Sequence, residues 1–153
     1  MNPKLLLALA FVMSGGLLGC SRTPVYQMSY TPNATFRVVV EPAKTKVHVR
    51  ESFMVALRVE NLTTTNQYVP TESQGWQSQW RVSKTNPSLI YLAATANIPI
   101  TIKIPPGGAD TNEMQMLVNK PVTANKVSFQ MGFTPHDTKT TFWSNEVTIE
   151  VIP

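Results

Sequence analysis

From Phe36 to the end of the chain, apolar and polar residues alternate over short stretches separated by turn-forming residues. The alternation is most regular between Ile98 and Ile104, where isoleucine occupies every second position. Side chains of a β-strand point alternately to its two faces, so this period is typical of a strand that buries one face. We therefore expect strands at 36–40, 46–50, 53–60, 67–69, 76–82, 98–104, 114–118, 127–133 and 142–151, with a short apolar run at 89–92.

No segment after Cys20 has the spacing of an amphipathic helix. Short strands with turn signals between them are typical of two antiparallel sheets that pack face to face. We predict an immunoglobulin-like antiparallel β-sandwich of about seven to nine strands. The likeness is one of architecture, because Cys20 is the only cysteine and the cysteine pair of antibody domains is therefore absent.

Three residues refine the expected strands. Pro70 is expected to end the strand at 67–69, because proline has no N–H to donate to a neighbouring strand. For the same reason, Pro99 is expected at a strand start or on a sheet edge. Gly132 lies between two apolar strand residues and indicates a bulge or a close approach of another part of the chain.

The first residues have the pattern of an export signal. Lys4 precedes a short apolar stretch, Leu5 to Met13, and the helix-weakening residues Ser14 to Gly16 follow. The stretch is shorter than the roughly 20 apolar residues that a permanent membrane-spanning helix needs.

This segment closes with Leu17-Leu18-Gly19-Cys20, which resembles the lipobox of bacterial lipoproteins. The resemblance implies cleavage between Gly19 and Cys20. It also implies a diacylglycerol on the Cys20 thiol, often with an acyl chain on the new amino terminus. Several acyl chains hold a protein stably to a bilayer, whereas one chain binds only marginally. The acylated Cys20 would thus make the lipid bilayer a partner of the protein.

The chain accordingly divides into three parts. We expect a helical signal peptide at 1–19, the lipidated cysteine and a flexible tether at 20–35, and the sandwich at 36–153. In lipoproteins an aspartate after the cysteine tends to retain the protein in the inner membrane. Ser21 occupies that place here, so the resemblance implies the outer membrane, facing the periplasm, rather than the inner one.

The charge and cysteine content of the chain limit the kinds of partner and of covalent bond that we expect. The 13 lysines and arginines exceed the nine aspartates and glutamates to give a net charge of +4, but the basic residues are scattered, so we expect no nucleic-acid surface. A single cysteine allows no internal disulfide, and a free thiol is a liability in an oxidising compartment. Lipidation of Cys20 would remove that liability.

Enzymatic chemistry has little support in the sequence. The histidines are His48, on an alternating strand, and His136, which stands next to Asp137 in a turn-like stretch. Adjacent residues in a loop seldom form a catalytic pair, and no nucleophile motif accompanies them. Two separated histidines do not make a zinc site. We therefore expect no catalytic residue and no cofactor, and a protein that is not an enzyme.

Methionine raises the question of copper. Met114 and Met116 share one strand face, and Met131 could come from a neighbouring strand. Thioethers are soft ligands that select Cu(I), so a periplasmic Cu(I) carrier is one hypothesis. The alternative is that these methionines fill the core, as methionine commonly does. The choice depends on whether Met114 and Met116 are exposed.

The aromatic residues raise a similar choice. Trp76 and Trp80 share strand parity, so one of them could fill the core while the other lines a recognition surface. For Trp143 and Tyr68, as for most of these residues, core packing is the simpler expectation.

Part of the domain resembles a known family. Phe53-x-Val55-x-Leu57-x-Val59-x-Asn61-x-Thr63, then a tryptophan-containing strand and an isoleucine-rich strand ending in Pro106-Gly107-Gly108, is similar to bacterial immunoglobulin-like domains of the intracellular proteinase inhibitor type. The resemblance implies protease inhibition through an exposed loop. Candidate loops are 63–68, 71–76, 93–97 and 134–140, none with a recognisable reactive sequence.

The leading hypothesis is a non-enzymatic, membrane-anchored binding or structural lipoprotein of the cell envelope. It would act by contact with a protein partner through its loops or an exposed sheet edge. Protease inhibition and Cu(I) transport are the alternatives.

Overall fold

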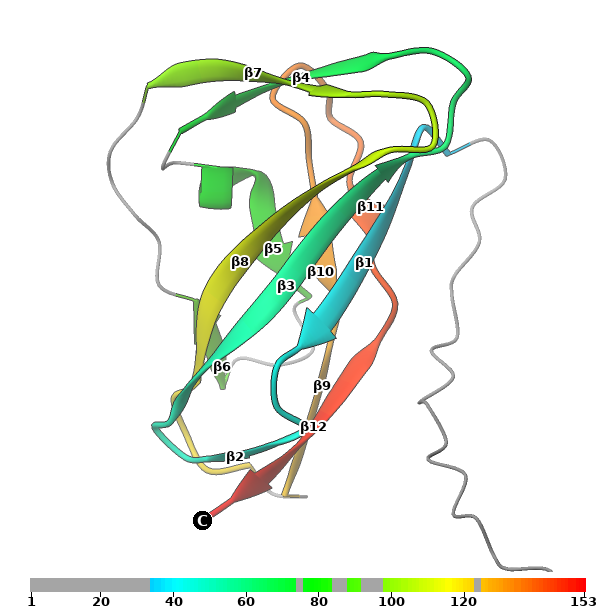
Figure 1. Cartoon of the computed structure of the whole chain (residues 1–153). Coiled ribbons are helices and arrows are strands. Elements are labelled where there is room, and N and C mark those ends of the chain that lie inside the picture. Colours follow the sequence, from blue (N-terminus) through cyan, green and yellow to red (C-terminus); the bar gives the residue numbers. More distant parts are fainter. Residues whose placement is uncertain (1–33, 74–75, 84–87, 92–97, 123–124) are drawn as a thin grey trace, which may run out of the picture.

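The computed structural model describes residues 34–73, 76–83, 88–91, 98–122 and 125–153, which form strands and one 3₁₀ turn (Figure 1). The strands are β1 (Phe36–Pro42), β2 (Lys46–His48), β3 (Ser52–Asn61), β4 (Gln67–Glu72), β5 (Trp80–Val82), β6 (Leu89–Tyr91), β7 (Pro99–Ile104), β8 (Ala109–Val118), β9 (Lys126–Phe129), β10 (Met131–Phe133), β11 (Phe142–Trp143) and β12 (Val147–Ile152). The 3₁₀ turn η1 (Trp76–Gln79) precedes β5.

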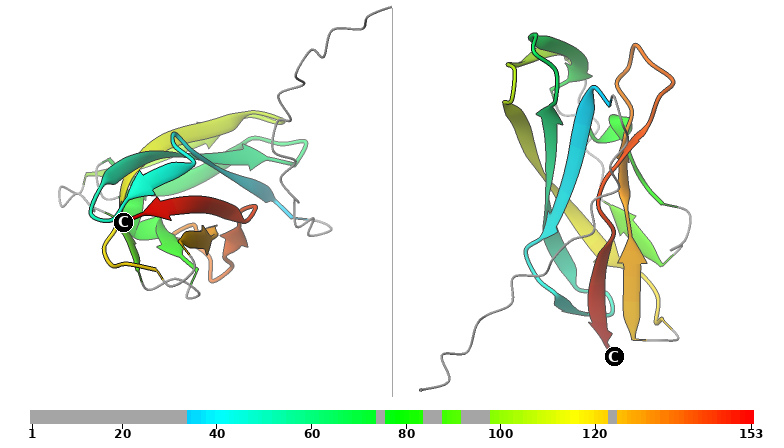
Figure 2. Two further views of the ribbon diagram at one scale, coloured as in Figure 1. Left: turned by 90° about the horizontal axis from the view of Figure 1, so that it is seen from below. Right: turned by 90° about the vertical axis from the view of Figure 1, so that its right-hand side faces the viewer.

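The strands form two layers (Figure 2). One layer is an antiparallel sheet in the order β1-β3-β8-β6. The other consists of two short sheets, β11-β10-β5 and β2-β12-β9, which continue one another because β9 leads into β10 and β11 into β12. This arrangement corresponds to the ABED and CFG sheets of an immunoglobulin-like sandwich. The predicted fold class is confirmed.

The core lies between the two layers and follows from the alternation of the strands. Along β3, Phe53, Val55, Leu57 and Val59 are buried while Met54 and Arg58 face outward. The other layer contributes Val127 and Phe129 from β9, and the inward side chains of β12. The fully buried side chains are Val40, Val47, Val55, Leu57, Ile104, Met114, Met116, Val118, Val127, Phe129, Met131 and Ile149.

A buried polar kink separates β11 from β12. The side chain of Asn145 accepts a hydrogen bond from the Val40 N–H (3.0 Å) and donates one to the Val40 carbonyl (3.2 Å). Ser144 accepts a hydrogen bond from the Met131 N–H (3.0 Å) and donates to the Asn145 carbonyl (2.7 Å). These side chains satisfy backbone groups that a regular ladder would otherwise pair. The predicted strand at 142–151 is therefore two strands.

The predicted strand at 127–133 is also divided, at Gln130. The part before it pairs with β12, whereas the part after it pairs with β11 and β5. The close approach predicted at Gly132 is confirmed, since a Cβ there would lie 2.9 Å from Cζ3 of Trp143 and 2.7 Å from Cγ2 of Thr141.

Strands β4 and β7 pair only with each other among the described residues and form a ribbon at one end of the sandwich (Figure 1). The prediction that Pro70 ends its strand is wrong, because β4 continues to Glu72. The Ser73 N–H donates to the Ile98 carbonyl (2.9 Å), and the alternation from that pair places Pro70 and Pro99 where an N–H would face away from the partner strand. Proline is tolerated there, and the expectation of an edge position for Pro99 is confirmed.

Candidate functional site

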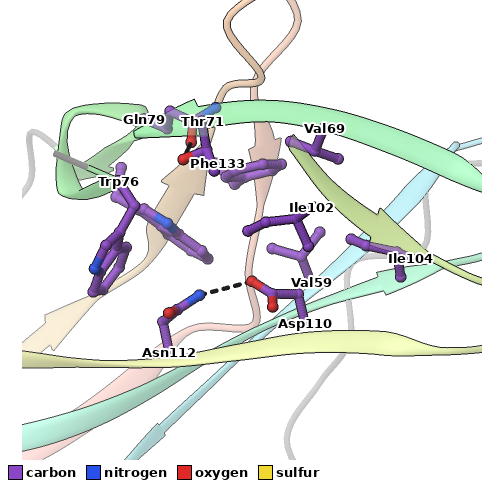
Figure 3. Close-up of a pocket in the computed structure, with 11 residues that line it drawn as sticks. Val59, Val69, Thr71, Trp76, Gln79, Ile102, Ile104, Asp110, Asn112 and Phe133 are labelled. Atoms are coloured by element: carbon purple, nitrogen blue, oxygen red, sulfur yellow. Dashed lines mark hydrogen bonds between the residues drawn. The ribbon is translucent and has the colours of Figure 1, made fainter. Parts of the chain in front are cut away.

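A cleft opens between the β4–β7 ribbon and the end of the sandwich (Figure 3). Its volume is about 320 Å³, including the part open to solvent. It is lined by Val59, Val69, Thr71, Trp76, Gln79, Trp80, Ile102, Ile104, Asp110, Asn112 and Phe133. Most of these side chains are apolar or aromatic and a few are polar, which is the usual composition of a binding pocket. The part of the cleft that is closed off from solvent has room for about one water-sized group, so it suits the tip of a side chain and not a whole ligand.

The ribbon contributes one apolar wall of the cleft. Val69 lies opposite Ile102 in the register of β4 and β7, and Thr71 lies opposite Ile100. Val69 and Ile104 are buried, while Ile102 is only partly covered. The sandwich contributes Trp80 and Phe133, whose ring centroids are 5.2 Å apart.

The rim of the cleft is held by side-chain hydrogen bonds from η1. Gln79 is buried and accepts a hydrogen bond from the Thr71 hydroxyl, and its Nε2 donates to the Pro70 carbonyl (2.9 Å). These bonds tie η1 to β4, so that Trp76, the first residue of η1, is positioned at the cleft.

A carboxylate and an amide occupy inward-facing positions of β8 at the cleft. Asp110 and Asn112 have the same parity as the buried residues Met114 and Met116. Their side chains are joined by a hydrogen bond from Asn112 Nδ2 to Asp110 Oδ2 of 2.7 Å (Figure 3). Burial raises the pKa of Asp110, and the hydrogen bond from Asn112 opposes that shift.

The apolar face of the ribbon continues beyond the cleft. Ile100 and Ile98 follow Ile102 on the same face of the chain, and they are 42% and 67% exposed. The sequence predicted a strand with one buried isoleucine face. Only its second half is covered, because the ribbon extends past the end of the sandwich.

The methionine hypothesis is corrected by the structure. Met114, Met116 and Met131 are each at most 1% exposed and belong to the hydrophobic core. The condition set for a copper carrier, exposure of Met114 and Met116, is therefore not met. They occupy inward positions of β8 and fill the sandwich as isoleucine or valine would.

Neither histidine lines the cleft. His48 faces outward from β2 and its Nδ1 is 3.3 Å from the Pro153 carbonyl oxygen, while His136 is exposed in the turn after β10. Within the described residues, no three His, Cys, Asp or Glu side chains converge as a metal site would require.

The expectation that most of the tryptophans and Tyr68 pack in the core is only partly met. Trp80 is 4% exposed and packs in the core, and Trp76 lines the cleft, so one fills the core and the other faces a surface. They do not share a strand, because Trp76 begins η1. Core packing is wrong for Tyr68, which is 60% exposed, and for Trp143, which lies on Gly132 with the Arg81 guanidinium 5.2 Å from its ring.

The two motif segments singled out in the sequence, at 53–63 and 106–108, meet in space. The Asn61 N–H donates to the Gly108 carbonyl (2.9 Å), and the Gly107 N–H donates to the Asn61 carbonyl (3.1 Å). Gly107 has a φ of 66°, a conformation that favours glycine. The Asn61 side chain is fully buried and bonded to Thr63, Thr65 and Ile104. The motif is thus explained as a structural link between the two turns.

The predicted lipidation residue Cys20 and the cleavage site Gly19–Cys20 lie outside the described residues, as do most of the tether and the loop at 93–97. No helix among the residues that the structure describes is both long enough and apolar enough to cross a membrane.

The fold has the layers and strand order of an immunoglobulin-like sandwich. A solved structure with a similar fold is that of a FixG-related protein from Vibrio parahaemolyticus. The two share 14% sequence identity with a TM-score of 0.51, over 78% of this chain and 99% of the other. At this identity the likeness shows the fold alone. No family model and no curated protein matches the chain.

The cleft carboxylate was not predicted from the sequence. The strand expected at 114–118 starts at Ala109, so that Asp110 and Asn112 are its first inward residues. The signal was present, since their parity matches that of Met114, Met116 and Val118. Polar residues at those positions concealed the strand.

Proposed function

We propose that the protein is a non-enzymatic binding module of the bacterial cell envelope, anchored by lipid on Cys20, that binds a partner protein at the ribbon end of its sandwich. The observation that carries the proposal is the apolar wall of the cleft together with the exposed side chains of Ile100 and Ile98 on the same face of the ribbon. Exposed apolar side chains next to a hollow that can receive the tip of a side chain are found at protein interaction sites.

The geometry of the chain is consistent with an anchored module. The Leu62 N–H donates to the Thr35 carbonyl (3.0 Å), so the domain begins beside the ribbon, whereas Val49 and Ile152 bond at the opposite end. The proposed tether would thus enter next to the binding surface. With the lipid anchor in the periplasmic leaflet of the outer membrane, we therefore expect the binding surface to face partners that lie close to that membrane.

A pull-down with matched variants tests the binding function. The bait is residues 21–153, which retain every described residue, and it is exposed to envelope extract of the source cells. Ile100→Ser should lose the captured protein, because it removes apolar surface beside the cleft. Ile90→Ser is the control, since Ile90 is 38% exposed, close to the 42% of Ile100, but lies on β6. Equal capture by both variants, or no partner identified by mass spectrometry and rebinding, overturns the proposal.

The anchor is tested separately by mass spectrometry of the mature protein. We expect an amino terminus at Cys20 that carries the mass of a diacylglycerol, and release of the protein from membranes in Cys20→Ser. A mature protein that keeps residues 1–19, or that is membrane-bound with an unmodified thiol, contradicts the anchor without affecting the binding surface.

One observation favours protease inhibition as a second candidate. The loop at 62–66 is exposed except at Thr63, which is partly buried. Side-chain bonds hold it, since Asn61 accepts from the Thr63 N–H (2.9 Å) and Thr63 accepts from Gln67 Nε2 (3.0 Å). A loop already ordered before binding loses little entropy in a protease cleft. A panel of proteases assayed with residues 21–153 tests this candidate, and the absence of inhibition at micromolar concentration excludes it.

A further inference from the structure

Asp110 is a carboxylate at an inward position of β8. In the pairing of β3 and β8, Asp110 lies opposite Val59 and Asn112 lies opposite Leu57. Both partners are buried apolar residues, and the next inward residue of β8 is Met114. Asp110 is partly buried, and a carboxylate that loses part of its water among apolar neighbours carries a desolvation cost unless a cation pairs with it.

The charge of Asp110 is not balanced by any cation among the described residues. Their side-chain ion pairs join Arg37 and Arg58 to Glu60, Lys44 to Glu51, and Lys46 to Glu150. The side-chain bond made by Asp110 is the one from Asn112, a neutral donor. Residues retained at a cost to stability are expected at functional sites.

The surroundings of Asp110 suit one kind of ligand group. Trp76 and Ile102 line the same cleft, and they offer an aromatic surface and an aliphatic one. Long basic side chains pack an aliphatic stem on apolar surface while their charged head meets a carboxylate or an aromatic ring. Asn112, hydrogen-bonded to the carboxylate, would hold it in place for that contact.

We propose that the cleft receives the cationic end of a lysine or arginine side chain of the partner protein at the Asp110 carboxylate, while the stem of that side chain lies across Trp76 and Ile102 at the cleft mouth. This inference rests on the proposed binding function and adds the chemistry of the partner's anchoring residue. The apolar part of the partner would then lie along Ile100 and Ile98. The charge complementarity of Asp110 decides in favour of a basic rather than an apolar anchor.

A titration followed by nuclear magnetic resonance tests the inference without knowledge of the partner. The probes are N-acetyl-lysine N-methylamide and its norleucine counterpart, which has a similar aliphatic stem but no ammonium group. We expect the lysine probe to shift the Trp76 indole N–H and the Asn112 side-chain amide in a saturable way. It should bind about five-fold more tightly than the norleucine probe, the scale of a partly exposed ion pair. Added salt should reduce the difference.

Matched variants isolate the charge. Asp110→Asn should remove the preference for lysine, whereas Asp137→Asn, a change at an exposed turn residue, should keep it. Trp76→Phe assigns the indole resonance. Equal binding of the two probes, or no saturable shift in a folded protein, overturns the inference. If the pull-down succeeds while the probes bind equally, the binding function stands and the basic anchor fails. If the lysine probe binds more tightly while the pull-down fails, the preference of the cleft for a basic group stands and the proposed protein partner fails.

Discussion

The two ends of the sandwich treat a carboxylate in opposite ways. At the end where β2 lies, Glu51 accepts hydrogen bonds from Lys44 Nζ (2.6 Å) and from the His48 N–H (2.8 Å), so its charge is compensated. At the ribbon end, Asp110 faces apolar walls and is bonded to a neutral amide. Accordingly the pKa of Glu51 is lowered, chiefly by the hydrogen bond from Lys44, and the pKa of Asp110 is raised by burial. The comparison sets a compensated carboxylate against an uncompensated one, and the proposed binding site rests on that difference.

The largest expected effect is a difference in the free energy of unfolding between alanine variants at the two ends of the sandwich. Met116→Ala, near the β2 end, should lower the free energy of unfolding by about 2–5 kcal/mol, because it leaves a cavity in a fully buried site. Ile100→Ala, on the ribbon, should cost less than about 1 kcal/mol, since its side chain is already partly solvated. Chemical denaturation of both variants measures the difference, and equal losses would contradict the view of the ribbon as loosely covered.

The next effect compares two asparagine side chains. Asn145→Ala should cost about 2–4 kcal/mol, because it leaves the buried N–H and C=O of Val40 without their partners. Asn112→Ala removes a single bond in a partly exposed cleft and should cost about 1 kcal/mol or less. Denaturation curves of the two variants test the ranking, and a larger loss for Asn112→Ala would reverse the proposed roles.

A smaller effect should appear as a gain in stability. The raised pKa means that folded Asp110 holds its proton more tightly than the unfolded chain does. Stability from this group is therefore present at low pH and is lost as pH rises from its ordinary value of 3.8 through the higher folded value. Asp110→Asn should raise the melting temperature at pH 7 more than at pH 3. Thermal unfolding at both pH values checks this, and an equal change at both would exclude the burial of a charge as its cause.

The smallest effect should have the opposite dependence on pH. The lowered pKa of Glu51 means that its contribution is present above the ordinary value of 4.5 and is lost as pH falls through the lower folded value. Glu51→Gln should therefore lower the melting temperature slightly at pH 7 and leave it unchanged well below the folded pKa. The group is exposed, so the shift is small, and it should shrink with added salt.

The strands of the sandwich were predictable where apolar and polar residues alternate without interruption. Buried and exposed residues alternate along β3 as the sequence implied, and β1 begins at Phe36 as expected. The expectation that β9 and β10 form one strand failed at Gln130, where the pairing partner changes without any break in the apolar pattern. Which strand a segment pairs with is decided by contacts distant in sequence, and a local period cannot report it.

The candidate site was less predictable for a related reason. Its walls come from seven elements of the chain, and the sequence gives no measure of where a ribbon leaves the sandwich. The sequence indicated that one of Trp76 and Trp80 could line a surface but not which of them, and Asp110 was missed because a carboxylate does not signal an inward position. Ile98 appeared to belong to the best-defined strand, yet it is the most exposed of the large apolar residues described.

The placement of the two chain ends has a practical consequence for attaching the protein to a surface. The described chain begins beside the ribbon, where Thr35 bonds Leu62, and it finishes at Pro153 next to His48, at the far end of the sandwich (Figure 1). A sensor chip or bead coupled through a carboxy-terminal tag would hold the cleft outward, whereas coupling through the amino terminus would turn it toward the support. The direction of immobilisation would then decide whether a captured ligand is detected at all.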